Sequence, residues 1–453
     1  MSRKERRMRI SSRRSLVVTA VTGVAALGLA ACGGGSSGGS SGTSHLGSTT
    51  SGSIVWSASP ISGSGASDTR TVLIKAFEKA YPKIHVSLNS APTNTDTYRA
   101  SLATQISGGA NTPDVYMGDV IWPAQFGEHG FAVPLSKYLP KSYWSKFYPG
   151  LVQGATYKGE IYGSPLFQDM GFLYYRKDLL AKEHMSVPTT WEQVETDAKT
   201  LVSKHLVKYG FVWQGDSYEG LTCNFMEYLA SAGGEVTNPQ YTKSLINSAA
   251  ANKAVTFMRS LITSGASPSA VSTFQEPQSM NVFAAGQSAF LRNWDYAYDY
   301  SIKPATSKLK KSQVGVTSLP TFAGHPSPGY ANIGGWNLYI NPHSKHLGVD
   351  LTFIKWMAGT TAQTILAKQY GEISTVTSVR TSPSIVASTP TFAIAAKAKL
   401  IPRPAGTPNY AAVSTAIYTN VNSVLAGSSS VSSALSSANS AIQTALTSKA
   451  GGL

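Results

Sequence analysis

Aromatic and acidic residues gather at the ends of segments whose pattern predicts β-strands. Sugar rings need this mixture, because their apolar C–H faces stack on aromatic rings while their hydroxyl groups donate to carboxylates and accept from arginine or amide groups. The groups are Asp119 with Trp122, Phe167 with Asp169, Trp213 with Tyr218 and Glu219, the run 292–296, and Gly334 to Trp336. Their shared placement predicts a carbohydrate-binding site, whereas Trp191 and Trp356 lie on predicted helix faces and are expected in the core.

Two other motifs are better explained without a ligand. The run from Gly63 to Asp68 superficially resembles a dinucleotide-binding loop, but it lacks the third glycine or alanine and places a carboxylate where a phosphate would bind. His343 and His346 lie three residues apart in a loop that contains proline, with no further ligand pattern nearby. We therefore expect neither a nucleotide cofactor nor a metal site.

The elements that position the acidic residues alternate regularly in the first third of the chain. Strands are predicted at 53–59, 84–88 and 113–118, with a helix from Asp68 as N-cap to the residue before Pro82, and a second helix at 98–107. This alternation is typical of a parallel α/β sheet. Ligands bind beyond the carboxyl ends of strands in such sheets, which is where Asp119 lies.

Later segments continue the alternation of strands and helices, but the signals at their boundaries are weaker. The predicted strands are 166–176, 211–213, 288–291, 314–316 and 337–340. The predicted helices start near Trp191, cover 221–232 and 347–359, and resume in the Ser- and Ala-rich segment from Ser428 onward.

The N-terminus predicts export and a lipid anchor. The first fourteen residues carry seven Lys and Arg against one acid, and an uncharged stretch of small and apolar residues runs from 15 to 31. Residues 1–31 thus have the order of a signal peptide and end at Cys32, as the bacterial lipobox does, where the cysteine is diacylated. Arg13 and Arg14 also resemble a twin-arginine motif, so both export routes stay open. Residues 32–52 form a Gly/Ser-rich tether that would span roughly 25 Å as a flexible coil.

Composition limits the remaining possibilities. About 400 residues are too many for one ordinary domain, so two lobes are expected, and no further apolar run is long enough to cross a bilayer. The signal segment holds 7 of the 38 Lys and Arg and 1 of the 23 Asp and Glu, which leaves a net charge of +9. No basic cluster is interleaved with aromatic residues, so a nucleic-acid partner is not expected. Cys223 has no cysteine partner and is expected to be buried.

From about Ser53 onward the chain resembles the extracellular solute-binding proteins (family 1) of carbohydrate ABC importers, and most closely their trehalose/maltose-binding branch. The runs that carry this resemblance are 77–82 (FEKAYP), 113–119 (PDVYMGD), 173–180 (LYYRKDLL), 211–215 (FVWQG), 218–221 (YEGL), 292–294 (RNW), 334–336 (GGW) and 403–404 (RP). The resemblance implies an α/β, two-lobed periplasmic-binding-protein-like fold of class II, whose discontinuous lobes close on the sugar by a hinge. It places the N-terminal lobe at 53–172 and 320–357, and the C-terminal lobe at 173–319 and 358–453.

The resemblance also implies the residues that contact sugar. They are Asp68, Arg99, Asp119, Asp169, Trp294, Gly335, Trp336 and Arg403, with Glu219 in the second lobe at the same cleft. Aspartates would accept from hydroxyl pairs, arginines would donate, the two indoles would stack on glucose rings, and the Gly335 N–H would donate to a hydroxyl. Two positions depart from the family: Asp68 stands where a longer Glu is usual, and Phe167 replaces a Tyr hydroxyl, which removes about 1 kcal/mol of hydrogen bonding.

The implied partners are an α-glucoside disaccharide, the membrane subunits of an ABC permease, and the membrane itself through Cys32; the protein is expected to act as a monomer without a cofactor. Two alternatives belong to other classes. A secreted glycoside-active enzyme would use Asp119 and Asp169 as acid and base, and released glucose would reveal it. A cell-wall adhesin would show repeats, and the sequence contains none.

Overall fold

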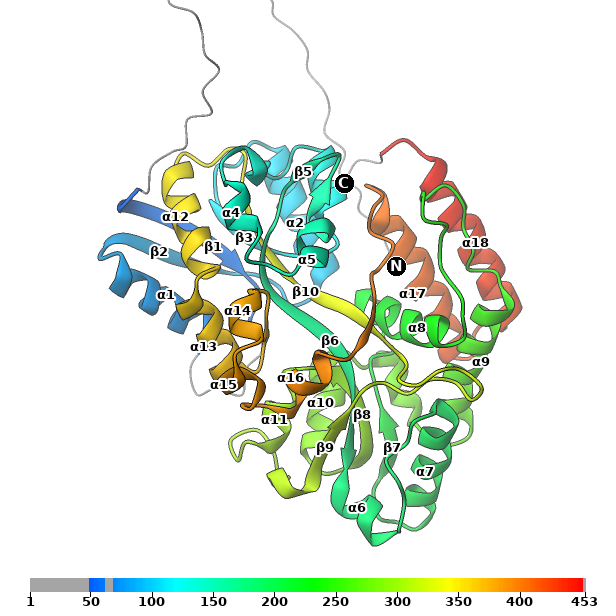
Figure 1. Ribbon diagram of the computed structural model, residues 1–453. Helices are drawn as coiled ribbons and strands as arrows, with labels where there is room; N and C mark the ends of the chain where they lie inside the picture. Colours follow the sequence, from blue (N-terminus) through cyan, green and yellow to red (C-terminus); the bar gives the residue numbers. More distant parts are fainter. Residues whose placement is uncertain (1–48, 62–67, 451–453) are drawn as a thin grey trace, which may run out of the picture. The chain divides into compact units, whose positions relative to one another are not determined.

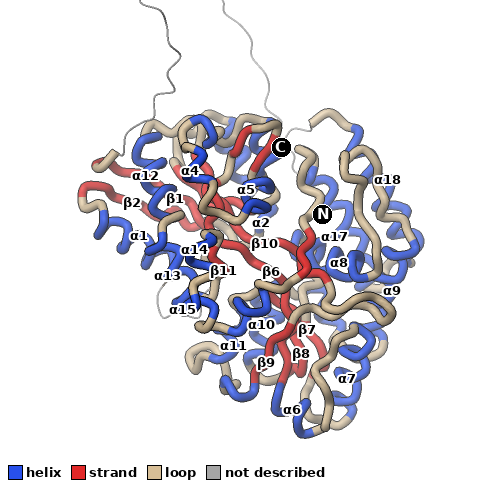
Figure 2. Tube along the Cα trace, viewed as in Figure 1, coloured by secondary structure: helices blue, strands red, loops and turns tan. Residues whose placement is uncertain are grey.

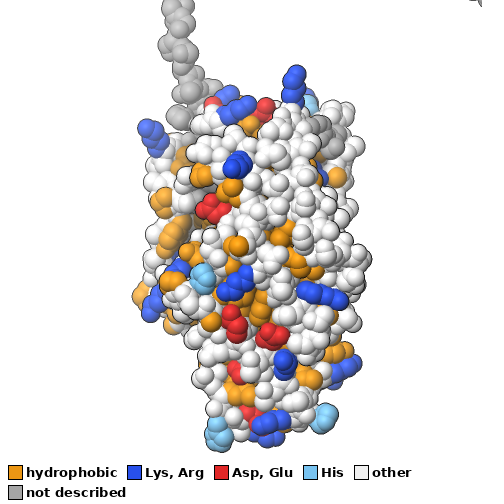
Figure 3. Space-filling model, turned by 90° about the vertical axis from the view of Figure 1, so that its right-hand side faces the viewer, with side chains coloured by type: hydrophobic (Ala, Val, Ile, Leu, Met, Phe, Trp, Pro, Cys, Tyr) orange, Lys and Arg blue, Asp and Glu red, His pale blue; other side chains and the backbone are white. Residues whose placement is uncertain are grey.

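The structure is a computed structural model that describes residues 49–61 and 68–450. The predicted signal peptide, Cys32 and the glycines of the run 63–65 lie outside the described residues. In the described part, no helix combines the length and apolar character needed to cross a membrane. On the face that Figure 3 displays, charged side chains are scattered, and hydrophobic side chains lie between them.

The first three strands and two helices match the predicted alternation. β1 (Ser51–Ala58) pairs in parallel with β2 (Lys83–Ser90) on one side and β3 (Val115–Asp119) on the other. α1 (Thr69–Ala80) and α2 (Thr95–Ser107) connect them. Asp68 caps α1 as predicted, since its carboxylate accepts from the Arg70 N–H at 2.9 Å.

The parallel pairing predicted from the first three strands is confirmed, but it does not extend to the long central strands of the sheet, which run antiparallel. β10 (Tyr330–Ile340) runs antiparallel to β3, and β6 (Ser164–Arg176) runs antiparallel to β10. The reason is that β10 returns from the second half of the chain, and not through the short helical crossover that makes a parallel pair. β10 also begins seven residues before the predicted 337–340 segment, because Gly334 and Gly335 conceal the strand pattern.

β6 and β10 carry the sheet from one half of the molecule to the other. The strand order is β2-β1-β3-β10-β6-β8-β7, with β9 and β11 (Ile373–Ser374) also pairing with β6 and β12 (Lys399–Ile401) with β10. β6 pairs with β10 along its first residues and with β8 (Ser288–Trp294) and β9 (Val314–Thr317) along its last. β7 (Tyr209–Val212) runs parallel to β8. Figure 2 shows the two long strands crossing the middle of the fold.

Helices cover the second half of the sheet and its flank. The longer ones are α7 (Trp191–Ser203), α8 (Glu219–Ser231), α9 (Ala249–Thr263), α10 (Glu276–Ala284), α17 (Tyr410–Leu425) and α18 (Val431–Thr447). α17 packs against α8, α9 and α18, so that these helices form one group beside the sheet (Figure 1). The C-terminal helix predicted from Ser428 is confirmed as α18.

The predicted helix 347–359 is two helices. α12 (Leu347–Met357) ends before Gly359, and α13 (Thr360–Tyr370) begins after it. α12 packs on β1, where Phe353 meets Trp56 with ring centroids 5.3 Å apart. It also packs on α1, where Trp356 and Phe353 meet Phe77 with ring centroids 5.5 and 5.0 Å apart. α13 packs against α1 and α12, and β11 follows it onto β6 at Phe167 and Gln168.

Short elements complete the chain. They are α3 (Pro123–Glu128), α4 (Lys141–Trp144), α5 (Pro149–Gly154), β4 (Thr156–Tyr157), β5 (Glu160–Ile161), α6 (Lys177–Lys182), α11 (Ala297–Ile302), α14 (Thr377–Arg380), α15 (Pro383–Val386), α16 (Pro390–Ala395), and 3-10 turns at Leu135–Lys137, Ser269–Thr273 and Lys311–Gln313.

Candidate functional site

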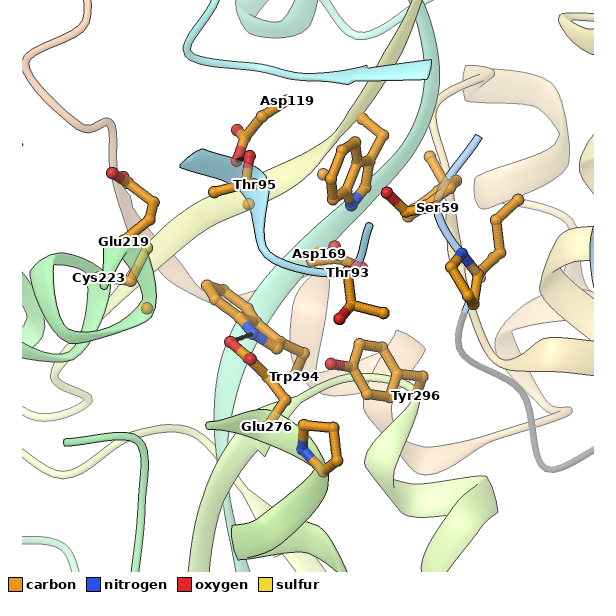
Figure 4. Close-up of a pocket in the computed structure, with 18 of the residues that line it drawn as sticks. Ser59, Thr93, Thr95, Asp119, Asp169, Glu219, Cys223, Glu276, Trp294 and Tyr296 are labelled. Carbon is orange, nitrogen blue, oxygen red and sulfur yellow. Dashed lines mark hydrogen bonds between the residues drawn. The ribbon is translucent and has the colours of Figure 1, made fainter. Parts of the chain in front are cut away.

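A cavity of about 320 Å³ lies where the ends of β3, β8 and α8 meet the middle of β6 and β10. This volume falls within the range of small-molecule sites. Its wall contains six aromatic side chains, four carboxylates and one guanidinium group, namely Phe167, Tyr218, Trp294, Tyr296, Tyr300 and Trp336, then Asp119, Asp169, Glu219 and Glu276, then Arg403. Several of them are shown in Figure 4. Apolar rings surrounded by a few polar groups are the surface that a sugar requires.

Strand register brings the residues of β6 and β10 to this wall. Trp336 lies opposite Phe167, and Gly334 lies opposite Asp169. Gly335 between them has φ +119°, and a Cβ there would lie 2.8 Å from the Cα of Gln168. Only glycine tolerates both conditions, so this position lets the two backbones approach closely and turns Trp336 toward the cavity wall.

Arg403 joins two acidic residues that come from different elements. Its Nη2 donates to Asp119 Oδ1 at 2.7 Å, and its Nη1 donates to Glu219 Oε1 at 2.9 Å. Tyr410 and Ser414 of α17 donate hydroxyl hydrogen bonds to the Glu219 carboxylate at 2.5 and 2.6 Å. Burial raises the pKa of Glu219 to about 7, although Arg403 opposes this shift.

Asp169 lies on β6 at the point where the strand changes partners. It is 6% exposed and lines the cavity. Burial raises the pKa of Asp169 to about 7, a hydrogen bond with Glu372 lowers it, and the charge of Asp119 raises it further. The Asp169 carboxyl group therefore contacts both the cavity and Glu372.

Three carboxyl groups, those of Asp169, Asp295 and Glu372, offer oxygens within 4.8 Å of one another. Asp295 already accepts from the backbone N–H groups of Met170 at 3.2 Å and Ile373 at 3.1 Å. The group therefore connects β6, the segment after β8, and β11. We interpret it as a structural connection between these strands, and it does not change the expectation of a site without metal.

Trp294 is fixed on its face and at its edge. The guanidinium group of Arg292 lies 4.2 Å from its ring centroid, and its Nε1 donates to Glu276 Oε1 at 3.2 Å. Arg292 and Glu227 form an ion pair whose side chains are each 1% exposed, and Arg292 Nη1 also donates to Gln214 at 3.0 Å.

Eight of the ten predicted site residues line the cavity, and two do not. The eight are Asp119, Phe167, Asp169, Glu219, Trp294, Gly335, Trp336 and Arg403. The Asp68 carboxylate instead caps α1 and accepts from Arg70 Nη2 at 2.5 Å. These two interactions use both of its oxygens. Arg99 Nη1 donates to Gln125 at 3.3 Å. The structure does not bring Asp68 and Arg99 to the cavity wall.

The remaining tryptophans of the acidic and aromatic groups belong to the core. Trp122 is 1% exposed and stacks on Phe126 with centroids 4.9 Å apart. Trp213 is fully buried and donates to Ser267 at 3.1 Å. The core positions predicted for Trp191 and for Cys223 are confirmed by exposures of 0% and 2%, although Cys223 also lines the cavity.

Several wall residues were not predicted as site residues, among them Thr95, Cys223, Glu276 and Tyr300. Glu276 is the first residue of α10, where an acid has an ordinary explanation through the helix dipole. Its neighbour Pro277 favours a helix start as well. No sequence signal distinguishes this carboxylate from a common helix N-terminus, so strand-end reasoning missed it.

Comparison with known proteins agrees with this geometry. Residues 63–364 match the family described as bacterial extracellular solute-binding protein. A probable ABC transporter-binding protein of Deinococcus radiodurans is 34% identical over 313 residues, which cover 68% of this chain and 73% of that protein. The structure of maltose-bound MalE3 of T. maritima has a TM-score of 0.79 and 32% identity, covering 86% of this chain and 99% of that one.

A more distant structure shares the fold alone. The GacH receptor of Streptomyces glaucescens has a TM-score of 0.77 at 24% identity, covering 87% of this chain and 98% of that chain. These likenesses confirm the predicted two-lobed α/β fold. The matching family and the Deinococcus relative are binding proteins, which favours a binding protein over the glycoside-active enzyme. The chain therefore belongs to the family of bacterial extracellular solute-binding proteins.

Proposed function

We propose that this protein captures an α-glucoside disaccharide, such as trehalose or maltose, and delivers it to the membrane subunits of an ABC importer. The observation that carries the proposal is the pair of indoles, Trp294 on β8 and Trp336 on β10, that line one cavity together with four carboxylates. Two indoles in one wall can each stack on a sugar ring, and carboxylates accept from ring hydroxyls.

The size of the cavity and one relative support a disaccharide. A volume of about 320 Å³ is at the small end of ligand sites, so it suits a ligand of a few rings better than a long glucan. The maltose-bound MalE3 is 32% identical to this chain, and the match covers 99% of MalE3 and 86% of this chain. A mannitol-binding protein of Pseudomonas aeruginosa is 28% identical over 165 residues, 36% of this chain and 37% of that protein. A linear polyol is therefore a useful comparison ligand.

In this proposal Asp119 and Asp169 accept hydroxyl hydrogen bonds, and Arg403 and the Gly335 N–H donate to sugar oxygens. Phe167 adds an apolar contact where a tyrosine would add a hydroxyl. Asp68 and Arg99 would reach the sugar only if their present bonds to Arg70 and Gln125 were exchanged for it.

The lobes would close on the sugar about the segments that cross between them. We place the first crossing near Phe172, where β6 leaves β10 for β8, and the second near Leu319. The lobe bounds implied by the family resemblance, 320–357 and 358–453, put the third crossing near Met357. We now propose a later position, after β11, because α13 packs against α1 and α12 and β11 pairs with β6 at Phe167. Groups from both lobes meet around the sugar, so binding would favour the closed form.

A lipid on Cys32 would hold the protein outside the cytoplasm, at the membrane face where the permease receives the sugar. Two acyl chains anchor a protein firmly, and the tether 32–52 leaves the lobes free to reorient. Replacing Cys32 with Ala should release the protein from the membrane without changing its sugar affinity. Retention of the variant in the membrane fraction would contradict the anchor.

The sugar assignment is tested by a thermal-shift panel of trehalose, maltose, sucrose, longer α-glucans and D-mannitol. A ligand present at about 100 times its Kd stabilises the folded protein by about 2.7 kcal/mol. We expect an α-glucoside disaccharide to give the largest rise in melting temperature. If no sugar moves the melting temperature, the proposed function is wrong, and if mannitol gives the largest rise, the disaccharide assignment is wrong.

A further inference from the structure

Glu276 is a cavity residue that lies outside the positions implied by the family resemblance. It is the first residue of α10, it is half-buried, and it faces the cavity beside Trp294 (Figure 4). Its Oε1 accepts the indole N–H of Trp294 at 3.2 Å.

The backbone of Glu276 is held in place. Its carbonyl oxygen accepts from Ser279 Oγ at 3.0 Å and from Asn293 Nδ2 at 3.3 Å. The preceding Gln275 donates from its side chain to Asp216 at 2.7 Å. These bonds tie the start of α10 to the end of β8, so the Glu276 carboxylate and the Trp294 ring are positioned as one unit.

This carboxylate has hydrogen-bonding capacity that Trp294 does not use. An ionised carboxylate can accept about four hydrogen bonds, and the indole takes one of them. The Tyr218 hydroxyl lies next to Glu276: this residue is 6% exposed, it lines the same cavity, and its hydroxyl donates to the Glu276 carboxylate. Burial raises the pKa of Tyr218, and the charge of Glu276 and this hydrogen bond raise it further. The carboxylate therefore keeps about two free acceptor positions, and the phenol oxygen can also accept a hydrogen bond.

The orientation of these groups determines which hydroxyls they can reach. An acceptor bonded to an indole N–H lies close to the plane of the indole, at its rim. A pyranose that stacks on Trp294 is parallel to that plane and directs its equatorial hydroxyls outward toward the rim. An axial hydroxyl points away from the rim, toward or away from the indole face.

We infer that Glu276, together with Tyr218, is a specificity-determining residue that accepts equatorial hydroxyls of the sugar ring stacked on Trp294. The site thereby selects gluco-configured rings over rings that carry an axial hydroxyl. This inference rests on the proposed function and names the configuration of the ligand.

The test is titration calorimetry with the α-glucoside that the wild type binds best, trehalose or maltose, and with analogues in which galactose or mannose replaces glucose. We expect the wild type to prefer the gluco ligand at least about tenfold. Glu276→Gln should weaken gluco binding about tenfold, which corresponds to losing one hydrogen bond to a charged group. It should weaken the epimers much less, so that the preference largely disappears.

One stability measurement and two further variants separate recognition from structure. Glu276→Gln keeps an acceptor for the Trp294 N–H, so its melting temperature without sugar should match the wild type. Glu195→Gln removes a half-exposed acid on α7, away from the cavity, and should change nothing. Trp294→Phe keeps a ring but releases Glu276 from the indole, and it should also reduce the epimer preference.

Unchanged affinity and unchanged epimer preference in Glu276→Gln would overturn the inference while leaving the proposed function intact. A wild-type protein that binds no α-glucoside would overturn both. The two failures are distinguishable because the first is measured in Glu276→Gln and the second in the wild type.

Discussion

Arg403 Nη2 donates to Asp119 Oδ1 at 2.7 Å, which ties the segment after β12 to the last residue of β3 across the cavity wall. The same guanidinium group donates to Glu219 Oε1 at 2.9 Å. A planar guanidinium group can donate hydrogen bonds to two carboxylates at once, and a lysine ammonium group cannot reproduce that geometry. Arg403 thus sets the position of two acids that line the cavity.

Arg403→Lys should therefore keep the charge but lose the alignment of Asp119 and Glu219. We expect sugar affinity to fall about tenfold or more, the loss typical of one charged hydrogen bond. Titration calorimetry of the variant measures this directly. Tyr330→Ala, which removes an aromatic ring that is 36% exposed, is the matched control and should bind normally. Wild-type affinity in Arg403→Lys would show that the guanidinium group is not needed to align Asp119 and Glu219.

The stability of the protein should fall as pH rises through the neutral range. The pKa of Asp169 is raised to about 7, so the folded state holds a proton that the unfolded state has released above its own pKa near 4. This contribution is fully present below the unfolded pKa and is lost as pH rises through about 7. Glu219 acts in the same direction.

Chemical denaturation at about pH 5 and about pH 8 measures this effect. One pKa unit corresponds to about 1.4 kcal/mol, so the wild type should lose at least about that amount over this interval. Asp169→Asn cannot titrate, and its stability should depend less on pH. Equal pH dependence in both proteins would mean that Asp169 is ionised at all these pH values.

The ion pair between Arg292 and Glu227 should be critical for folding because both side chains are buried. Arg292→Met leaves an unpaired carboxylate in the core, a change that costs about 3–5 kcal/mol of unfolding free energy. Lys158→Met breaks the exposed pair with Glu128 and should cost much less, because solvent screens that pair. Urea denaturation of both variants makes the comparison, and similar losses would contradict the structure around Trp294.

Cys223 offers a chemical probe of the cavity. It lines the wall, it is 2% exposed, and burial raises the pKa of its thiol. A form without residues 1–32 has Cys223 as its only cysteine. Alkylation by N-ethylmaleimide, followed by intact-protein mass spectrometry, should be slow and should slow further in proportion to sugar occupancy. Cys223→Ser should not react. A rate that saturating sugar leaves unchanged would place the ligand elsewhere.

Local sequence signals predicted much of the first half of the fold. Asp68 as a cap and Pro82 as a stop defined α1, and alternation defined β1 to β3. The direction of β10 was not predictable in this way, because it depends on a strand partner more than 200 residues away in the chain. Gly334 and Gly335 further concealed the start of that strand, for the same reason that they suit the site: they have no side chain.

The candidate site was predicted mainly by residue types at strand ends and by the family resemblance. Both kinds of prediction fail where a side chain has two possible partners. Asp68 was expected to contact the sugar, but its carboxylate pairs with Arg70, two residues away. Trp122 has the position of a wall residue and packs in the core instead. Glu276 lies 18 residues before Trp294 in the sequence, and the packing of α10 on β8 brings the two side chains together.

The most direct measurement is the titration of maltose and trehalose into the wild type and into Trp336→Ala. We expect saturable one-to-one binding of at least one of these sugars to the wild type, and affinity weaker by about tenfold or more once the Trp336 ring is lost. Wild-type protein that binds neither sugar, or Trp336→Ala that binds as tightly as the wild type, would contradict a sugar site in this cavity.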